Sequence, residues 1–167
     1  GVDGILISPI DAVAVRGGYA AAGQAGIPVI SIARHTDSPH QSAFVSMDEK
    51  KVGQDIAEWL VKAIDGEGEV AMITGPAGAA TFRNMAEGFD SVLENYPNVK
   101  VVLRKDAPLT REDGLRLAED ALIANPDLKG IYTANDELAL GASQAVNSAG
   151  KKGEVIITGL NGIPPAI

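Results

Sequence analysis

The chain has 167 residues, of which 46% are apolar and 22% charged, with a formal net charge of −8. Such a composition is typical of a globular protein with a sizeable core, and the negative charge disfavours nucleic acid, whose phosphates need clustered lysine and arginine. The absence of cysteine excludes disulfides and thiolate chemistry, and the apolar runs are far shorter than the roughly 20 residues of a membrane-spanning helix. We therefore expect neither a nucleic-acid partner nor membrane insertion.

Short runs of β-branched apolar residues alternate along the chain with longer segments of helical period. In chain order, strands are predicted at residues 5–8, 29–32, 70–74, 100–104, 130–133 and 155–158. Helices are predicted between them at residues 12–24, 50–64, 81–95, 111–124 and 137–149. This alternation is typical of βαβ units, so the sequence predicts an α/β fold with doubly wound parallel sheets.

Local signals mark the ends of the predicted helices. Thr110 followed by Asp113 resembles a capping box, and Asp136 is predicted to cap the last helix. Residues that stop a helix follow each segment: Gly26, Gly66, Pro97, Pro126 and Gly150.

The interval from Arg34 to Met47 interrupts the alternation, because polar and turn-forming residues there precede a short apolar run. We predict that the chain crosses between two lobes in this interval. A long surface loop beside a single sheet is the alternative interpretation.

Candidate binding residues follow the predicted strands, because a ligand of a doubly wound sheet lies beyond the carboxyl ends of its strands. Arginine offers a planar fork of donors, and asparagine offers a donor and an acceptor, as a polyol requires. Taken alone, Asn135 fits a helix cap as well as a ligand contact, and Arg34 fits a solvated loop charge better than a ligand contact. Their shared position after predicted strands favours a ligand site for both. The residues in this position are Ser8, Arg34, Thr74, Asn135 and Asn161.

No catalytic constellation stands out in the sequence. The segment GPAGAAT lacks the Lys-Ser/Thr pair of a phosphate loop, and G-x-G-x-x-G is absent, so its glycines are predicted to shape a close turn at the cleft. Neither Ser8 nor Ser31 lies in a G-x-S-x-G elbow. We therefore expect a protein that is not an enzyme, with no catalytic residue and no cofactor.

Two histidines and one tryptophan remain to be interpreted. His35 and His40 lie in one loop on either side of Asp37, a pattern that favours a solvated loop over a metal site. Trp59 lies beside Leu60 in an amphipathic helix and is predicted to pack rather than to stack on a ligand.

Several motifs resemble the ribose-binding family of type I periplasmic binding proteins. The most specific is TANDELALGA at residues 133–142, which resembles that family's N-D-x-x-A-x-G-A signature. The likeness extends over essentially the whole chain. Three further segments also resemble the family. They are residues 46–48 with Gly53 and residues 57–60, then residues 75–78 with Arg83 and residues 87–89, and finally residues 155–162.

The resemblance implies the solute-binding component of a bacterial ABC-type importer, exported to the periplasm and working with a membrane permease. Its ligand would be a monosaccharide, polyol or sugar acid held between two lobes. Leu109 would replace a frequently aromatic wall of the cleft. The positions expected to touch the ligand are Ser8, Arg34, Arg83, Asn135 and Asn161.

This sequence departs from the family pattern at two of the expected site positions. The family often places aspartate immediately before the first-lobe arginine, where Ala33 stands, and often places aspartate where Asn161 stands. Each departure removes a carboxylate acceptor for sugar hydroxyls. Arginines without these acids would favour a sugar acid or another anionic polyol.

The resemblance also implies a division of the chain. Residues 1–43 would form the C-terminal part of the first lobe with the crossover, and residues 44–167 most of the second lobe. We expect a chain truncated at both ends, because the first strand has nothing upstream to pair with and residues 161–165 set up a helix start that is not continued.

The same two-lobed fold also serves lactose-repressor-type regulators as an effector sensor. Repressor relatives usually carry a basic stretch before the first strand of the second lobe, where this chain has Gly-Glu-Gly-Glu-Val at residues 66–70. The acidic segment favours transport over gene regulation.

Overall fold

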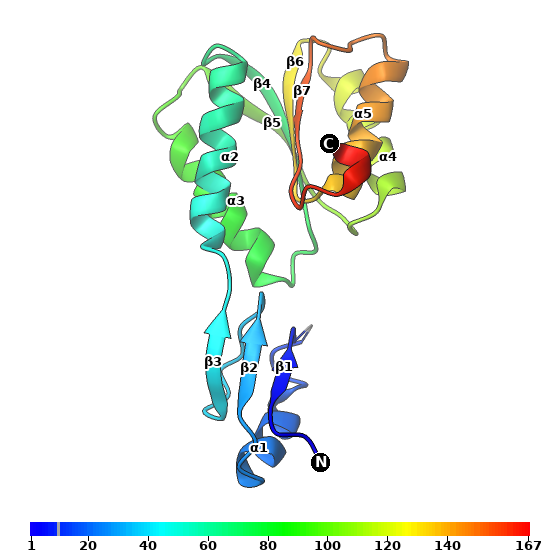
Figure 1. Cartoon of the computed structure of the whole chain (residues 1–167). Helices are drawn as coiled ribbons and strands as arrows, with labels where there is room; N and C mark the ends of the chain where they lie inside the picture. Colours follow the sequence, from blue (N-terminus) through cyan, green and yellow to red (C-terminus); the bar gives the residue numbers. More distant parts are fainter. Residues whose placement is uncertain (10) are drawn as a thin grey trace. The chain divides into compact units, whose positions relative to one another are not determined.

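A computed structural model describes residues 1–9 and 11–167, and the chain divides into two compact units, Gly1–Asp48 and Glu49–Ile167. Each unit has its own parallel sheet (Figure 1). The predicted α/β class with parallel sheets is therefore confirmed.

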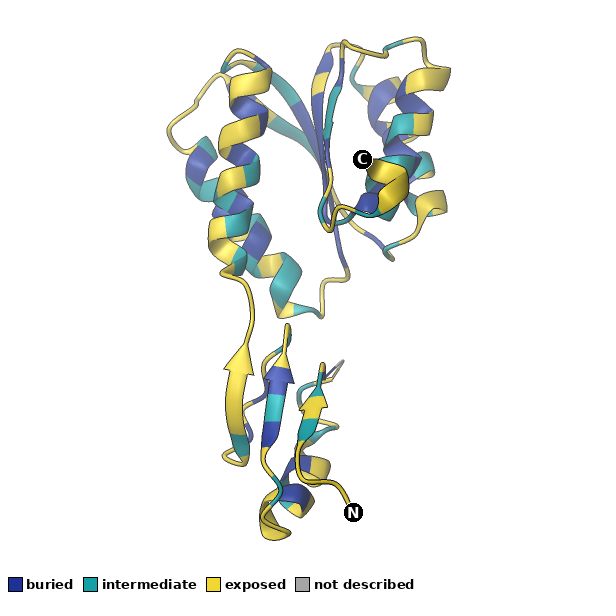
Figure 2. Ribbon diagram, viewed as in Figure 1, coloured by how far each residue is buried: buried dark blue, intermediate teal, exposed yellow. Residues whose placement is uncertain are grey.

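The first unit is a three-stranded parallel sheet in the order β1-β2-β3, accompanied by one helix. Tyr19 and Ala22 of the helix pack with Val29 of the sheet in a small core. Alternate strand residues point to the opposite face, where Leu6 is 69% exposed and Val45 is 60% exposed (Figure 2). The elements are β1 (Ile5–Ile7), α1 (Arg16–Gln24), β2 (Val29–Ile32) and β3 (Gln41–Val45).

Strand β3 lies inside the interval that the sequence predicted only as a crossing between lobes. Its residues pair in parallel with β2, with Ser31 opposite Phe44 and Ile32 opposite Val45. Because β3 belongs to the first sheet, the first compact unit extends to Asp48, while the predicted lobe boundary between residues 43 and 44 stays a prediction. The assignment of the units to two lobes of a larger protein stays a prediction.

The second unit is a four-stranded parallel sheet in the order β5-β4-β6-β7. Its strands are β4 (Gly68–Thr74), β5 (Val99–Asp106), β6 (Leu128–Thr133) and β7 (Ile156–Thr158). Its helices are α2 (Glu49–Ala63), α3 (Ala80–Leu93), α4 (Arg111–Ala124) and α5 (Asp136–Ser148), followed by a short 3₁₀ turn, Pro164–Ala166.

Helices cover both faces of this second sheet. Val70 and Met72 of β4 pack in a core with α2 and α3, whereas the alternate residues Ala71 and Ile73 pack in a core with α4 and α5. Helix α3 therefore follows β4 on one face, and α5 follows the neighbouring β6 on the other. This arrangement makes a topological switch point beyond the ends of β4 and β6, which is where ligands of open α/β sheets bind.

The helices of each pair cross at glycines. A Cβ atom added to Gly53 of α2 would lie 1.9 Å from the Met85 carbonyl oxygen, and one added to Gly88 of α3 would lie 2.0 Å from that of Lys50. Gly141 of α5 approaches α4 in the same way. Because backbone atoms form these contacts, larger side chains have no room at the crossings.

The helix ends confirm most of the predicted signals. Gly26, Gly66 and Gly150 adopt positive φ angles of 71°, 78° and 72° just after α1, α2 and α5, as helix-terminating glycines do. Thr110 accepts a hydrogen bond from the Asp113 amide at 3.1 Å and so caps α4.

Predictions for two single residues are wrong. The cap of α5 is Asn135 and not Asp136, because the Asn135 side chain accepts the hydrogen bond from the Leu138 amide. Trp59 does not pack in the core: it is 57% exposed, since α2 buries Ala57, Leu60 and Val61 instead.

Candidate functional site

The candidate residues of the second unit lie at one edge of its sheet. The four parallel strands end at Thr74, Asp106, Thr133 and Thr158, so their carboxyl ends share that edge. The candidates follow these ends along the chain: Arg83 in α3, Leu109 after β5, Asn135 after β6 and Asn161 after β7. The residues chosen for following strands and those implied by the family resemblance thus belong to segments that leave the same edge of the sheet, and their contact with a ligand stays a prediction.

Asn135 is a helix cap with one polar group to spare. Its Oδ1 atom accepts a hydrogen bond from the Leu138 amide at 2.9 Å. The Nδ2 hydrogens of this half-buried carboxamide are left to donate elsewhere. The helix-cap interpretation is therefore confirmed. A ligand contact through Nδ2 is compatible with it and stays a prediction.

Asp136 positions the turn that carries Asn161. It is buried, its amide donates to the Leu160 carbonyl at 2.9 Å, and its Oδ2 atom accepts from the Ile163 amide at 2.8 Å. Between these contacts Asn161 and Gly162 adopt positive φ angles of 111° and 66°. The Asp136 contacts hold this exposed turn next to the start of α5.

Arg83 lies on a cavity of about 280 Å³ between β4, β5 and α3. Its Nη1 atom donates to the Ala77 carbonyl at 2.7 Å, which ties the helix to the glycine-rich loop. In that loop a Cβ on Gly75 would come within 2.3 Å of the Phe82 ring, as expected for the predicted close turn. The remaining nitrogens of Arg83 are available to a ligand.

Sequence reasoning missed Asp106, which lines the same cavity. The predicted strand stopped at residue 104, but β5 continues to Asp106, directly opposite Thr74 of β4. Thr74 Oγ1 donates a hydrogen bond to Asp106 Oδ1. The only sequence signal was a polar pair, Lys105-Asp106, after an apolar run, and it does not reveal the pairing partner.

Leu109 lies between the end of β5 and the Thr110 cap of α4. It is partly buried against the core formed by α4 and α5. The structure therefore presents an apolar surface at the position where the family resemblance implies a wall of the cleft.

In the first unit, Ser8 and Arg34 follow β1 and β2 at the carboxyl ends of that sheet. Ser8 is exposed, and Arg34 is half-buried with no ion-pair or hydrogen-bond partner for its guanidinium group among the described residues. Ala33 precedes it with φ at 63°, and the Arg34 amide donates to the Ile32 carbonyl at 2.7 Å. Such a tight turn with positive φ is strained for alanine.

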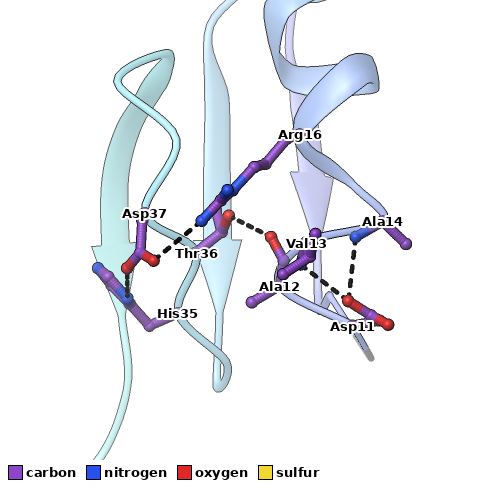
Figure 3. A network of polar contacts seen from close by, with 8 residues as sticks. All are labelled: Asp11, Ala12, Val13, Ala14, Arg16, His35, Thr36 and Asp37. Atoms are coloured by element: carbon purple, nitrogen blue, oxygen red, sulfur yellow. Dashed lines mark hydrogen bonds and ion pairs between the residues drawn. The ribbon is translucent and has the colours of Figure 1, made fainter.

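A polar network fastens the loop that follows Arg34 to the loop that follows β1 (Figure 3). Buried Thr36 donates to the Ala12 carbonyl at 2.9 Å, and Asp37 lies 3.2 Å from Arg16 and 3.7 Å from His35. Asp37 therefore forms its ion pair with Arg16, and the described residues show no contact between Asp37 and Arg34. No group of three or more His, Asp or Glu side chains in residues 1–9 and 11–167 is arranged to hold a metal ion.

The same network shortens the first helix. Asp11 Oδ1 accepts from the Val13 and Ala14 amides at 2.8 and 3.0 Å, and these bonds, that of Ala14 foremost, hold the pKa of Asp11 below its ordinary value. The turn occupies residues where the sequence predicted helix from Ala12. Helix α1 consequently begins only at Arg16.

Parallel sheets flanked by helices, as in both units, match the architecture of type I periplasmic binding proteins. Residues 1–167 match the family described as periplasmic binding protein domain, and the chain belongs to that family. The ribose import binding protein RbsB of Bacillus subtilis is 31% identical over 167 residues, which are 100% of this chain and 53% of the relative. The D-allose-binding periplasmic protein of Escherichia coli is 33% identical over 171 residues, 98% of this chain and 55% of the relative.

Solved structures give the same result. A periplasmic solute-binding protein of an ABC transporter from Actinobacillus succinogenes with bound D-allose matches 99% of this chain and 61% of its own, with a TM-score of 0.94 and 33% identity. A Bacillus halodurans solute-binding protein with bound myo-inositol matches 99% and 58%, with a TM-score of 0.89 and 31% identity. The resemblance to ribose-type binding proteins is thus confirmed, and the chain spans about half the length of the curated relatives it matches.

Within the described residues, no helix has the length and apolar character needed to cross a membrane. The relatives described above are all named as binding proteins.

Proposed function

We propose that this chain is part of the solute-binding component of a bacterial ABC-type importer, which reversibly binds a monosaccharide, polyol or sugar acid. The observation that carries the proposal is the carboxyl edge of the second sheet. Arg83, Asn135 and Asn161 lie there around a topological switch point. Relatives with the same fold are named for ribose and allose or contain bound D-allose and myo-inositol.

The chemistry of this edge suits a hydroxylated ligand. Arg83 retains donors beyond the one used by Ala77, and Asn135 retains its Nδ2 amine. Arg34 and Ser8 offer further donors at the edge of the first sheet, and Leu109 offers an apolar surface for the carbons of a sugar ring. A few fixed polar groups around an apolar wall are typical of small-molecule sites.

The remaining parts of the proposal follow from the family. In this proposal, residues 1–43 belong to a first lobe and residues 44–167 to a second lobe. The ligand is held between the two lobes and is passed on to a membrane permease. The protein acts in the periplasm and is not an enzyme, with no catalytic residue, cofactor or metal in its mechanism. Binding and release, without covalent chemistry, are sufficient for this role.

Replacement of Arg83 by alanine in the complete protein tests the ligand site. We expect a loss of sugar affinity of about 2 kcal/mol or more, because a charged donor is removed from a desolvated contact. Isothermal calorimetry with a panel of sugars and polyols measures the effect. Lys129→Ala, which removes a positive charge at the start of β6 on the opposite edge of the sheet, is the control.

Two results would count against the proposal. One is wild-type affinity in Arg83→Ala for a sugar that Lys129→Ala also binds normally. The other is a complete protein that binds no sugar or polyol of the panel. Circular dichroism melting of both variants separates a lost contact from a lost fold, since Arg83 also contacts the loop at Ala77.

A further inference from the structure

The cavity beside Arg83 has a charge balance that the sequence does not reveal. Two arginines and three acids line it: Arg83, Arg104, Glu87, Asp90 and Asp106. Arg104 forms an ion pair with Asp90, so these two charges offset one another. Glu87 is exposed on α3. Arg83 and Asp106 are exposed as well, so the cavity keeps one cation and two anions outside the Arg104–Asp90 pair. Asp106 differs from Glu87 because the Thr74 hydroxyl orients its carboxylate.

Asp106 is held in a defined orientation. It ends β5 in register with Thr74, and the Thr74 hydroxyl donates to Asp106 Oδ1. Thr74 is itself buried at the end of the central strand β4. The second carboxylate oxygen, Oδ2, has no partner among the residues that the structure describes. One oxygen therefore orients the carboxylate, and the other remains to accept a hydrogen bond.

We propose that Asp106 is a specificity-determining acceptor that selects a neutral polyol over the corresponding sugar acid. The inference rests on the function proposed above and deepens it. The chain lacks carboxylates at Ala33 and Asn161, where its family resemblance places acids. Asp106 supplies a carboxylate to the cavity of Arg83 from a different strand end, β5.

Arg83 and Asp106, which line the same cavity, together suit two adjacent hydroxyl groups of a ligand. A hydroxyl donates to the carboxylate and its neighbour accepts from the guanidinium, so both charged groups are satisfied by a neutral ligand. A carboxylate of the ligand would also attract Arg83, but it would face the negative charge of Asp106 on the same cavity. Such like-charge contact is a means of rejecting the wrong ligand.

The test compares neutral sugars with their oxidised acids in the complete protein: D-ribose with D-ribonate, D-galactose with D-galacturonate and D-allose with D-allonate. We expect Asp106→Asn to lower the affinity for the best neutral sugar at least about tenfold, because asparagine can still accept from Thr74 but loses the charge-assisted bond. In Asp106→Asn, the ratio of the affinity for a neutral sugar to the affinity for the matching acid should fall roughly tenfold or more, because the repulsion between the two carboxylates is removed.

Two further variants complete the experiment. Asp127→Asn removes one negative charge from an exposed site just before β6, at the opposite edge of the sheet, and should bind as the wild type does. Thr74→Val keeps the carboxylate but removes the hydroxyl that orients it. Its affinity should fall by less than that of Asp106→Asn.

Two kinds of result contradict the proposal, and they separate the role of Asp106 from the proposed function. Wild-type preference for a sugar acid, or an Asp106→Asn variant with wild-type affinity and selectivity, refutes the role of Asp106 and leaves the proposed function intact. A wild-type protein that binds none of the sugars refutes both.

Discussion

The two units differ in how far helices cover the faces of their parallel sheets. Strands of parallel sheets carry apolar residues on both faces, so both faces need cover. In Glu49–Ile167, the pair α2 and α3 covers one face and the pair α4 and α5 covers the other. In Gly1–Asp48, α1 packs on one face, while Leu6, Ile32 and Val45 are exposed (Figure 2).

The cores differ accordingly. The second unit has two cores with large, fully buried side chains, among them Leu60, Met72 and Phe89. Among the described residues of the first unit, the buried apolar cluster is smaller and consists of Tyr19, Ala22 and Val29, with four partly buried side chains packed against it: Ile5, Ile7, Val15 and Ile27. Since burial of apolar surface is the main favourable term in folding, we expect the second unit to be the more stable of the two.

The largest expected effect comes from separating the units. We expect residues 49–167 alone to unfold in one cooperative transition and residues 1–48 alone to show none, because the small core of the first unit cannot offset the entropy of ordering its chain. Circular dichroism melting and amide hydrogen exchange of the two fragments measure this. A cooperative transition in residues 1–48 would contradict the comparison.

The next effect concerns the glycines at the helix crossings. Gly53→Ala should destabilise the complete protein by about 3 kcal/mol, because the new methyl group overlaps the Met85 carbonyl and forces α2 and α3 apart. Urea unfolding followed by circular dichroism measures the change.

The matched control lies in the first unit. Gly18 in α1 has open space at the position of a Cβ, so Gly18→Ala should be neutral or stabilise by roughly 0.5–1 kcal/mol through helix propensity. Equal destabilisation by the two substitutions would mean that the close approach of α2 and α3 is not the cause.

The smallest effect concerns the strained turn beside Arg34. Ala33→Gly should stabilise the protein by about 1 kcal/mol, because glycine adopts positive φ without the clash of a Cβ. Ala25→Gly, at an exposed site with φ of −82°, is the control and should be slightly destabilising. Thermal melting distinguishes the two, and a loss of stability in both variants would refute the strain at Ala33.

Several features of the site could be predicted from sequence because they depend on neighbours along the chain. Strand runs, helix period and helix-terminating glycines are local patterns, so the order of strands and helices was predicted apart from β3. The rule that ligands lie beyond strand ends then selected Ser8, Arg34, Asn135 and Asn161 without knowledge of which strands pair. Their ligand contacts stay predictions.

Other features depended on partners distant in sequence. The run that became β3 looked like part of a crossing, because only its pairing with β2 makes it a strand. Asp106 was missed because its role depends on lying opposite Thr74, 32 residues earlier. Asp136 was taken for a cap because its true partners, Leu160 and Ile163, come later in the chain.

The sequence by itself determined the α/β class, the succession of helices and strands and the resemblance to ribose-type binding proteins, since apolar periodicity and motifs are written in short segments. Tertiary structure alone decided strand order, the cover of each sheet face, the ion pair of Asp37 with Arg16 and the cavity shared by Arg83 and Asp106. The physical reason is that hydrogen bonds, burial and charge act between groups that are close in space, whatever their separation along the chain.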